Sequence, residues 1–132
     1  MLCIPEPDRK LLWRCRVLNE DIGALRNFLP DQRIIDTLAR LDADKLPKQE
    51  RMKIASILKL KDRMDTNQVE LNKISTRAEK AANKIPHTAL RKVAKLYCLD
   101  CRSICEIEKE CSFRKATIYQ YIRLLRGAHK SV

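Results

Sequence analysis

The sequence predicts an all-α protein, because its composition and its patterns both favour helices over strands. Only two of its 132 residues are glycine, whereas 34% are charged and 45% are apolar. β-rich folds use many glycines at turns and bulges, so this composition is typical of helices. Prolines separate the helical patterns, and the first turn of a helix accommodates them. The patterns cover residues 8–29, 31–42, 47–84 and 87–98, followed by a stretch from Ser103.

The first predicted helix carries one narrow apolar stripe. Its members recur at steps of three and four residues: Leu11, Cys15, Leu18, Ile22, Leu25 and Leu29. This spacing places them on one face of a helix, which must pack against another element.

The third predicted helix has the heptad pattern of a coiled coil. One series falls seven residues apart and a second fills the intermediate positions: Ile57, Met64, Leu71, Ala78 and Ile85, and Leu60, Asn67, Ile74 and Ala81. Such a seam packs against a helix of the same chain or of a second subunit, and Asn67 is the kind of polar exception that fixes register and oligomeric state. We expect a homodimer, although a helix in a compact bundle shows the same pattern.

The net charge of +11 is unevenly placed along the chain. Residues 1–50 are neutral, residues 51–96 carry +8 and residues 97–132 carry +3, with no carboxylate after Cys111. This distribution favours a polyanionic partner, of which nucleic acid is the commonest. The alternative is a solvated basic surface, which fits an even spread better.

The stretch after Ser103 has the pattern of two short helices around a tight turn. Ser103 and Glu106 have the spacing of a capping box, which predicts a helix from Ile104. The apolar pattern stops at SFR and resumes in KATIYQYIRLL. This is the arrangement of a helix-turn-helix, whose second helix enters the major groove of DNA.

The run SICEIEKECSFRKATIYQYIRLLRGA resembles the helix-turn-helix of sigma-factor region 4 and of related bacterial activators, and is similar to the DNA-binding tails of resolvases and invertases. With the seamed helices before it, the layout is similar to small phage late-transcription activators of the RinA and ArpU kind. The resemblance implies a mini-core of Ile107, Cys111, Phe113, Ile118 and Ile122. It places on the nucleic-acid side Arg114, Lys115, Thr117, Tyr119, Gln120 and Arg123.

Two residues depart from the pattern of these families. Glu108 stands where a small residue lets the helices approach, and Ser112 stands where the turn usually has glycine. Glu108 must therefore turn outward or find a cation; otherwise the helices splay or the register shifts. A hairpin that only packs is the alternative to DNA binding.

Each predicted contact residue has a role that its chemistry allows. Arg114 and Lys115 suit phosphates or guanine edges, and Thr117 and Gln120 suit base edges. Tyr119 suits a phosphate or a thymine methyl group. Along the DNA backbone we expect Arg123, Arg126 and Lys130. The contact could extend to Lys73, Arg77, Lys80 and Lys84; the alternative is that these four charges form a solvated flank of the coiled coil.

Four cysteines raise the alternative of a metal site. Cys98, Cys101, Cys105 and Cys111 are spaced C-x2-C-x3-C-x5-C, and the first pair has the knuckle spacing of zinc sites. Four thiolates could also hold an iron–sulfur cluster. Cys111, however, falls on the apolar face that the hairpin needs, where a thiol packs as a small hydrophobe. We expect core thiols, and no metal or other cofactor.

The sequence therefore predicts a DNA-binding transcription regulator, with a helical assembly region at 1–85 and a helix-turn-helix region at 86–132. Its partners would be double-stranded DNA, a second copy and RNA polymerase. No nucleotide-binding or hydrolase motif is present, so an enzyme is not expected. Without a signal peptide or a membrane span, we expect a cytoplasmic protein of a bacterium or a phage-infected host. The alternatives are a terminase-like DNA-binding ring and a helical protein adaptor.

Overall fold

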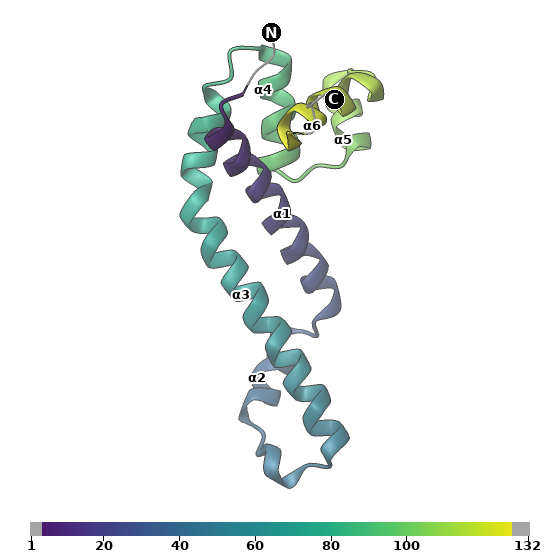
Figure 1. Ribbon diagram of the computed structural model, residues 1–132. Helices are drawn as coiled ribbons and strands as arrows, with labels where there is room; N and C mark the ends of the chain where they lie inside the picture. The colour runs from purple at the N-terminus through teal and green to yellow at the C-terminus, as the bar shows by residue number, and fades with distance from the viewer. Residues whose placement is uncertain (1–3, 128–132) are drawn as a thin grey trace. The chain divides into compact units, whose positions relative to one another are not determined.

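The computed structural model describes residues 4–127, and it is helical with no strand in that range (Figure 1). This confirms the predicted all-α class. The elements are α1 (Glu6–Phe28), α2 (Gln32–Arg40), the 3-10 turn η1 (Ala43–Lys45), α3 (Lys48–Asn83), α4 (Thr88–Ala94), the π-helical turn η2 (Lys95–Leu99), α5 (Ile104–Cys111) and α6 (Lys115–Arg126). The four predicted segments correspond to α1, α2, α3, and α4 with η2, because proline marks each boundary.

The chain forms two compact units. The terminal unit comprises the start of α1 up to Glu20 and everything from Leu71 onward, and the middle unit comprises residues 21–70. The last turns of α3 belong to the terminal unit, because they bury their apolar side chains together with those of α4 to α6. The assembly region at 1–85 and the helix-turn-helix region at 86–132 stay predictions.

The terminal unit has one continuous hydrophobic core. Its fully buried large side chains come from α1, α4, α5 and α6: Leu12, Leu18, Leu90, Val93, Ile107, Ile118 and Leu125. From α3 it receives Ile74 and three small residues, Ala78, Ala81 and Ala82. Alanines on a helix face allow the neighbouring helices to pack closely against it. The predicted stripe of α1 is shifted at its start, since Leu12 is buried and Leu11 only half-buried.

The middle unit has a much smaller core. Ile22, Leu25 and Ile35 are buried, whereas the seam residues Ile57, Leu60 and Met64 of α3 are half-buried. Large apolar side chains that a compact domain would bury therefore remain partly exposed in this unit.

Asn67, the polar member of the seam, has its partner within the same chain. Its amide donates to the carboxylate of Asp21 on α1. Arg63, one turn earlier on α3, donates to both oxygens of the same carboxylate, at 2.6 and 3.0 Å. Asn67, the residue predicted to fix the register, is bonded to α1. It therefore fixes the register of α1 against α3 within the middle unit.

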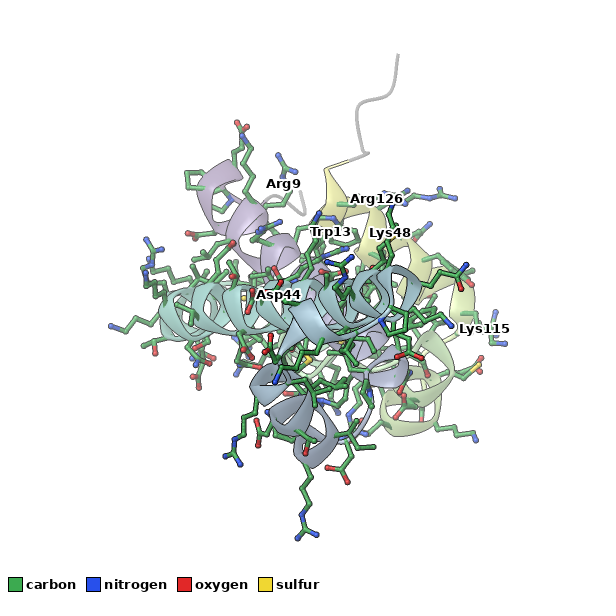
Figure 2. The ribbon with its side chains drawn as sticks, turned by 90° about the horizontal axis from the view of Figure 1, so that it is seen from below. Arg9, Trp13, Asp44, Lys48, Lys115 and Arg126 are labelled. Carbon is green, nitrogen blue, oxygen red and sulfur yellow. The ribbon has the colours of Figure 1, made fainter. Side chains whose placement is uncertain are left out.

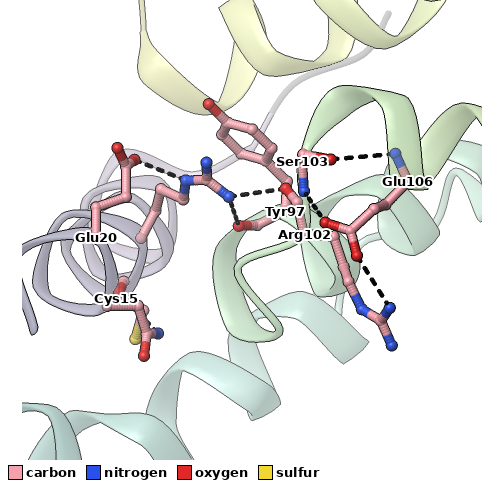
Figure 3. A network of polar contacts seen from close by, with 8 residues as sticks. Cys15, Glu20, Tyr97, Arg102, Ser103 and Glu106 are labelled. Atoms are coloured by element: carbon pink, nitrogen blue, oxygen red, sulfur yellow. Dashed lines mark hydrogen bonds and ion pairs between the residues drawn. The ribbon is translucent and has the colours of Figure 1, made fainter. Parts of the chain in front are cut away.

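Arg16 joins α1 to the end of η2 and to the loop that follows. Figure 3 shows its partners Glu20, Tyr97 and Arg102. One terminal nitrogen of its guanidinium donates to the carbonyl oxygens of Tyr97, at 3.0 Å, and Arg102, at 2.9 Å. Its Nε donates to Glu20 at 2.7 Å. The guanidinium carbon lies 3.8 Å from the centroid of the Tyr97 ring, which also stacks on Trp13. Arg16 therefore supplies a charged donor to one carbonyl in η2 and to one in the loop before α5.

A π-helical turn ends the α4 segment and directs the chain towards α5. The Asp100 N–H donates to Lys95 O at 3.0 Å, and the Arg102 N–H donates to Leu96 O at 2.9 Å. Cys101, between them, has a φ of 53°, in the left-handed region. The first of these bonds spans five residues, as in a π-helix, and the second spans six, so both are wider than the four-residue bonds of an α-helix.

Replacing Arg16 by methionine should destabilise the protein by about 3 kcal/mol. Methionine keeps the apolar stem but leaves two carbonyls without their charged donor, and such bonds contribute roughly 1.5–3 kcal/mol each. The measurement is the free energy of unfolding in urea. Glu20→Gln is the matched control: its carboxylate is half-exposed, so the loss should stay below about 1 kcal/mol. An Arg16→Met protein as stable as the wild type would contradict this role.

Candidate nucleic-acid interface

The predicted capping box begins α5 at Ile104, as the sequence indicates. The Glu106 N–H donates to Ser103 Oγ at 3.2 Å, and the Ser103 N–H donates to Glu106 Oε1 at 3.1 Å (Figure 3). The pKa of the Glu106 carboxyl lies below its usual range. The largest cause is its hydrogen bond with the Ser103 backbone, the second is its hydrogen bond with the Ser103 side chain, and the nearby Arg102 adds to both. The start of α5 is therefore fixed by reciprocal bonds.

The turn between α5 and α6 depends on Ser112 in a left-handed conformation. Ser112 has a φ of 58°, and its N–H donates to Glu108 O at 3.1 Å. Serine thus takes the backbone conformation that glycine usually supplies at this position. Phe113 follows and meets Tyr121 of α6 edge to face, with the ring centroids 6.4 Å apart. α6 then begins at Lys115.

The predicted mini-core is confirmed by burial. Ile107, Ile118 and Ile122 are buried, while Cys111 and Phe113 are half-buried against the same core. α6 contacts both α4 and α5. The two departures are accommodated, since Glu108 is only half-buried and Ser112 forms the turn. α5 and α6 remain packed against each other.

α6 is amphipathic, and its apolar side is the packed one. Ile118, Ile122 and Leu125 are buried on one face. On the rest of the helix and its N-cap, six of the predicted contact residues are exposed: Arg114, Lys115, Tyr119, Gln120, Arg123 and Arg126. In Figure 2 the side chains of Lys115 and Arg126 project from opposite ends of α6. Thr117 is half-buried, at the edge of this surface, and Lys130 lies outside the described residues.

Ala116 is an exposed residue of this surface that sequence reasoning missed. At 100° per residue it lies on the same face as Gln120 and Arg123, opposite the buried isoleucines. A small side chain there lets the helix backbone approach a partner closely, and its methyl group suits a thymine methyl. Its angle around the helix relative to Ile118 indicates that Ala116 is exposed. Alanine has no charged or polar group, however, that would indicate a contact residue.

Arg9, from α1, is a second residue that sequence reasoning missed. Its guanidinium donates to Arg126 O at 3.3 Å, at the end of α6. Gly127 ends the helix with a φ of 82°, and a Cβ there would lie 1.9 Å from Arg9 Nη1. Glycine therefore allows a cation from α1 to reach the carbonyl end of α6, where positive charge is favourable. Only the folded chain brings these residues together.

The basic stripe of α3 is exposed along its whole length. Lys73, Arg77, Lys80 and Lys84 recur at steps of four, three and four residues. Lys73, Arg77 and Lys80 therefore lie on one face of α3 and Lys84 directly follows the helix; all four belong to the terminal unit, as α6 does.

The four cysteines of the metal alternative do not form a ligand set. Cys98 is buried, Cys105 is exposed, and Cys101 and Cys111 are half-buried. Among residues 4–127, no three His, Cys, Asp or Glu side chains gather closely enough to hold a metal ion. Burial raises the pKa of the Cys98 thiol to about 12 and that of Cys15 to about 11. These two thiols are therefore protonated core residues at neutral pH.

Comparison of the chain with protein-family models, curated proteins and solved structures found no significant match. Across the described residues, no helix is both long enough and apolar enough to span a lipid bilayer. The candidate interface therefore rests on its own geometry and charge.

Replacing Ser112 by glycine should raise the free energy of unfolding by about 0.5–1 kcal/mol. The left-handed conformation costs a non-glycine residue roughly 1–2 kcal/mol, and part of this gain is offset by the greater freedom of glycine in the unfolded chain. Thermal or urea unfolding measures the difference. Ser112→Ala, which keeps the Cβ, is the control and should bring no gain. A Ser112→Gly protein less stable than wild type would show that the hydroxyl matters more than the backbone.

Stability should fall at alkaline pH partly through Cys98. Its pKa is about 12 in the folded protein against 9.0 ordinarily, so ionisation favours the unfolded chain. The stabilisation is complete below pH 9 and is lost as the pH rises towards 12. Urea unfolding at about pH 8 and about pH 10.5 should show a smaller loss for Cys98→Ala than for wild type. Cys105→Ser, at an exposed thiol, should lose as much free energy of unfolding between the two pH values as wild type does. An equal loss in all three proteins would show that Cys98 does not cause the fall in stability.

Proposed function

We propose that the protein is a sequence-specific DNA-binding regulator of transcription, and that α6 is its recognition helix. The observation that carries the proposal is the division of α6 into two faces. One face is anchored in the core by Ile118, Ile122 and Leu125, and the other presents polar and basic side chains to solvent. No carboxylate occurs from residue 112 to residue 132.

The dimensions of α6 suit a groove of DNA. A helix of 12 residues is about 18 Å long, and the major groove is about 12 Å wide. Ala116 and Gln120, in the middle of the exposed face, would meet base edges, where glutamine suits adenine. Arg114 and Lys115 at one end of α6, and Arg123 and Arg126 at the other, would hold phosphates.

The charge of the terminal unit supports the same function. Its stretches, residues 1–20 and 71–132, contain eighteen basic and eight acidic side chains, a net charge of +10. Such a field attracts DNA whatever its sequence. The exposed carboxylates near α6, Glu106 and Glu110, lie on α5. Phosphates would repel these carboxylates of α5. DNA would therefore bind more favourably to the side of the unit that α6 presents.

The likeness to sigma-factor region 4 and to the small phage activators extends the proposal to transcription. In this proposal α5, the turn and α6 act as a helix-turn-helix supported by α4. The protein would bind double-stranded DNA near a promoter and contact RNA polymerase there.

The variant Arg114→Glu with Arg123→Glu should fold normally and lose specific DNA binding. Both side chains are exposed, and the reversal turns attraction to DNA into repulsion at both ends of the predicted base-contact region. The measurement is retention of a fragmented genomic DNA pool at about physiological salt, where non-specific binding is weak, followed by sequencing. Wild type should enrich one or a few sites, and the variant none.

The matched control is Arg33→Glu with Arg40→Glu, which makes the same change in charge at exposed positions of α2. It should keep the enrichment. If the α6 variant retains the same sites as wild type, α6 is not the recognition helix. If wild type retains all fragments equally and weakly, the protein does not read sequence.

A further inference from the structure

A groove lies between the first turns of α1 and the last turns of α3, which run side by side in the terminal unit (Figure 1). Its volume is about 330 Å³. Six described residues line it: Pro7, Asp8 and Leu11 from α1, Arg77 and Lys80 from α3, and Lys84 directly after α3. We call it the α1–α3 groove. None of the six residues belongs to α5 or α6, so this groove is separate from the candidate interface.

The basic residues of the groove lie on one face of the helix. At about 100° per residue, Arg77, Lys80 and Lys84 fall within an arc of about 60° around the helix axis. The Lys84 N–H donates to Lys80 O at 3.2 Å, so the backbone at Lys84 still follows the helical path. Glu79 is the one carboxylate between residues 71 and 84. It lies at least about 100° from each of the three cations, and it lines a different cavity. With Asp8, the side chains that line the groove carry three positive charges and one negative charge.

The three cations of the groove are not neutralised by the rest of the chain. Among residues 4–127, they form no ion pair and no side-chain hydrogen bond. Three like charges in one groove repel one another, and this repulsion opposes folding. The negative end of a helix stabilises cations only in the last turn, whereas Arg77 precedes the last turn of α3. A bound anion would remove the repulsion.

The surroundings of the groove strengthen its attraction for an anion. Leu11 is half-buried and, with Pro7, gives the groove an apolar wall. A cleft with one dominant sign of charge and walls of low dielectric constant focuses the electric field, which raises the local concentration of oppositely charged ligands. Arginine binds phosphate through two parallel hydrogen bonds, and lysine binds it as a point charge. The α1–α3 groove therefore has the chemistry of a phosphate-binding site.

The length of the basic row indicates a chain of phosphates rather than a single one. Lys84 follows Arg77 by seven residues, which is a rise of about 10 Å along a helix. Lys73, exposed on the same face, extends the row by one further turn. A DNA strand carries one phosphate for about every 3.4 Å of duplex axis. A single phosphate would therefore meet only part of the row, whereas a DNA backbone would supply a phosphate for each cation.

We propose that the α1–α3 groove is a second DNA contact, which binds backbone phosphates and does not read sequence. The inference rests on the proposed function only in taking DNA as the partner. α1 connects this groove to α6, because Asp8 lines the groove while the neighbouring Arg9 donates to the last carbonyl of α6. Contacts in the groove add salt-dependent affinity for any duplex, and α6 supplies the preference for particular sites.

The experiment measures the affinity of the full chain for one duplex of random sequence between about 50 and about 200 mM salt. The groove variant is Arg77→Gln with Lys80→Gln and Lys84→Gln. Each lost phosphate contact reduces the slope of log affinity against log salt by about 0.9 in magnitude. We expect this slope to fall by roughly 2–3, and the affinity at the lowest salt to fall at least about 10-fold.

The matched control is Arg51→Gln with Lys53→Gln and Lys59→Gln. It also removes one arginine and two lysines from exposed positions of α3, but outside the groove, so that the net charge changes equally. Its slope should differ from that of wild type by less than about 1. Circular dichroism checks that each protein keeps its helices. A groove variant with the same slope as the control would overturn the proposal.

The enrichment of genomic sites by wild type tests the proposed function separately. If wild type enriches sites and the groove variant keeps the wild-type slope, the groove is not a DNA contact although the protein reads sequence. If wild type enriches no site and the groove variant loses slope, the groove binds DNA although α6 does not read it. Calorimetry with inorganic phosphate tests the other source of the same chemistry. A groove variant that loses phosphate binding but keeps the wild-type slope for DNA would show that the groove holds a free phosphate, and the proposal would be wrong.

Discussion

The guanidinium of Arg16 determines where α5 and α6 stand relative to α1. The carbonyl of Tyr97 lies in the π-helical turn η2 and that of Arg102 in the loop before α5, and Arg16 supplies a charged donor to each. Its side chain is only 12% exposed, with the Tyr97 ring against the guanidinium and Glu20 at its outer edge. Charged donors in such a site form strong, directional bonds because water competes weakly with them. The segment from Arg102 to α5 is therefore tied to α1 at one point.

Local contacts also hold α5 and α6, the helices of the candidate interface, in place. α5 starts at a reciprocal capping box, the turn is set by the left-handed backbone of Ser112, and α6 is anchored by three buried side chains. Its polar face therefore consists of side chains on a fixed helix, and a fixed helix loses little entropy when it binds. The Arg9 guanidinium at the end of α6 adds a second point of attachment to α1. Arg16 and Arg9 both belong to α1, so α1 contacts both the segment before α5 and the end of α6.

The two units differ in their cores and in their charge. The terminal unit has a continuous hydrophobic core and a net charge of +10. The middle unit has a small core, a net charge of +1 and five of the seven exposed large apolar side chains of the described residues. In the proposed function, the charge of the terminal unit attracts DNA.

The sequence by itself determined the helices and their faces. Proline positions gave the boundaries, the capping box gave the first residue of α5, and periodicity gave the buried set Ile107, Ile118 and Ile122. These features are local, because each depends on residues within one or two turns of helix. The resemblance to helix-turn-helix families, and not the periodicity, assigned exposed residues of α6 to the nucleic-acid side, and that assignment stays a prediction.

Only the tertiary structure decided which segments meet. The pairing of Asn67 with Asp21, of Arg16 with the end of η2, and of Arg9 with the end of α6 joins residues far apart in the sequence. The division into units also depended on packing, because α1 and α3 each contribute to both. A heptad pattern shows that a helix needs a partner but not which one, since any apolar face of the right spacing satisfies it. Which helix packs against this face depends on the total free energy of the contacts in the whole fold. The sequence of one helix does not determine that total.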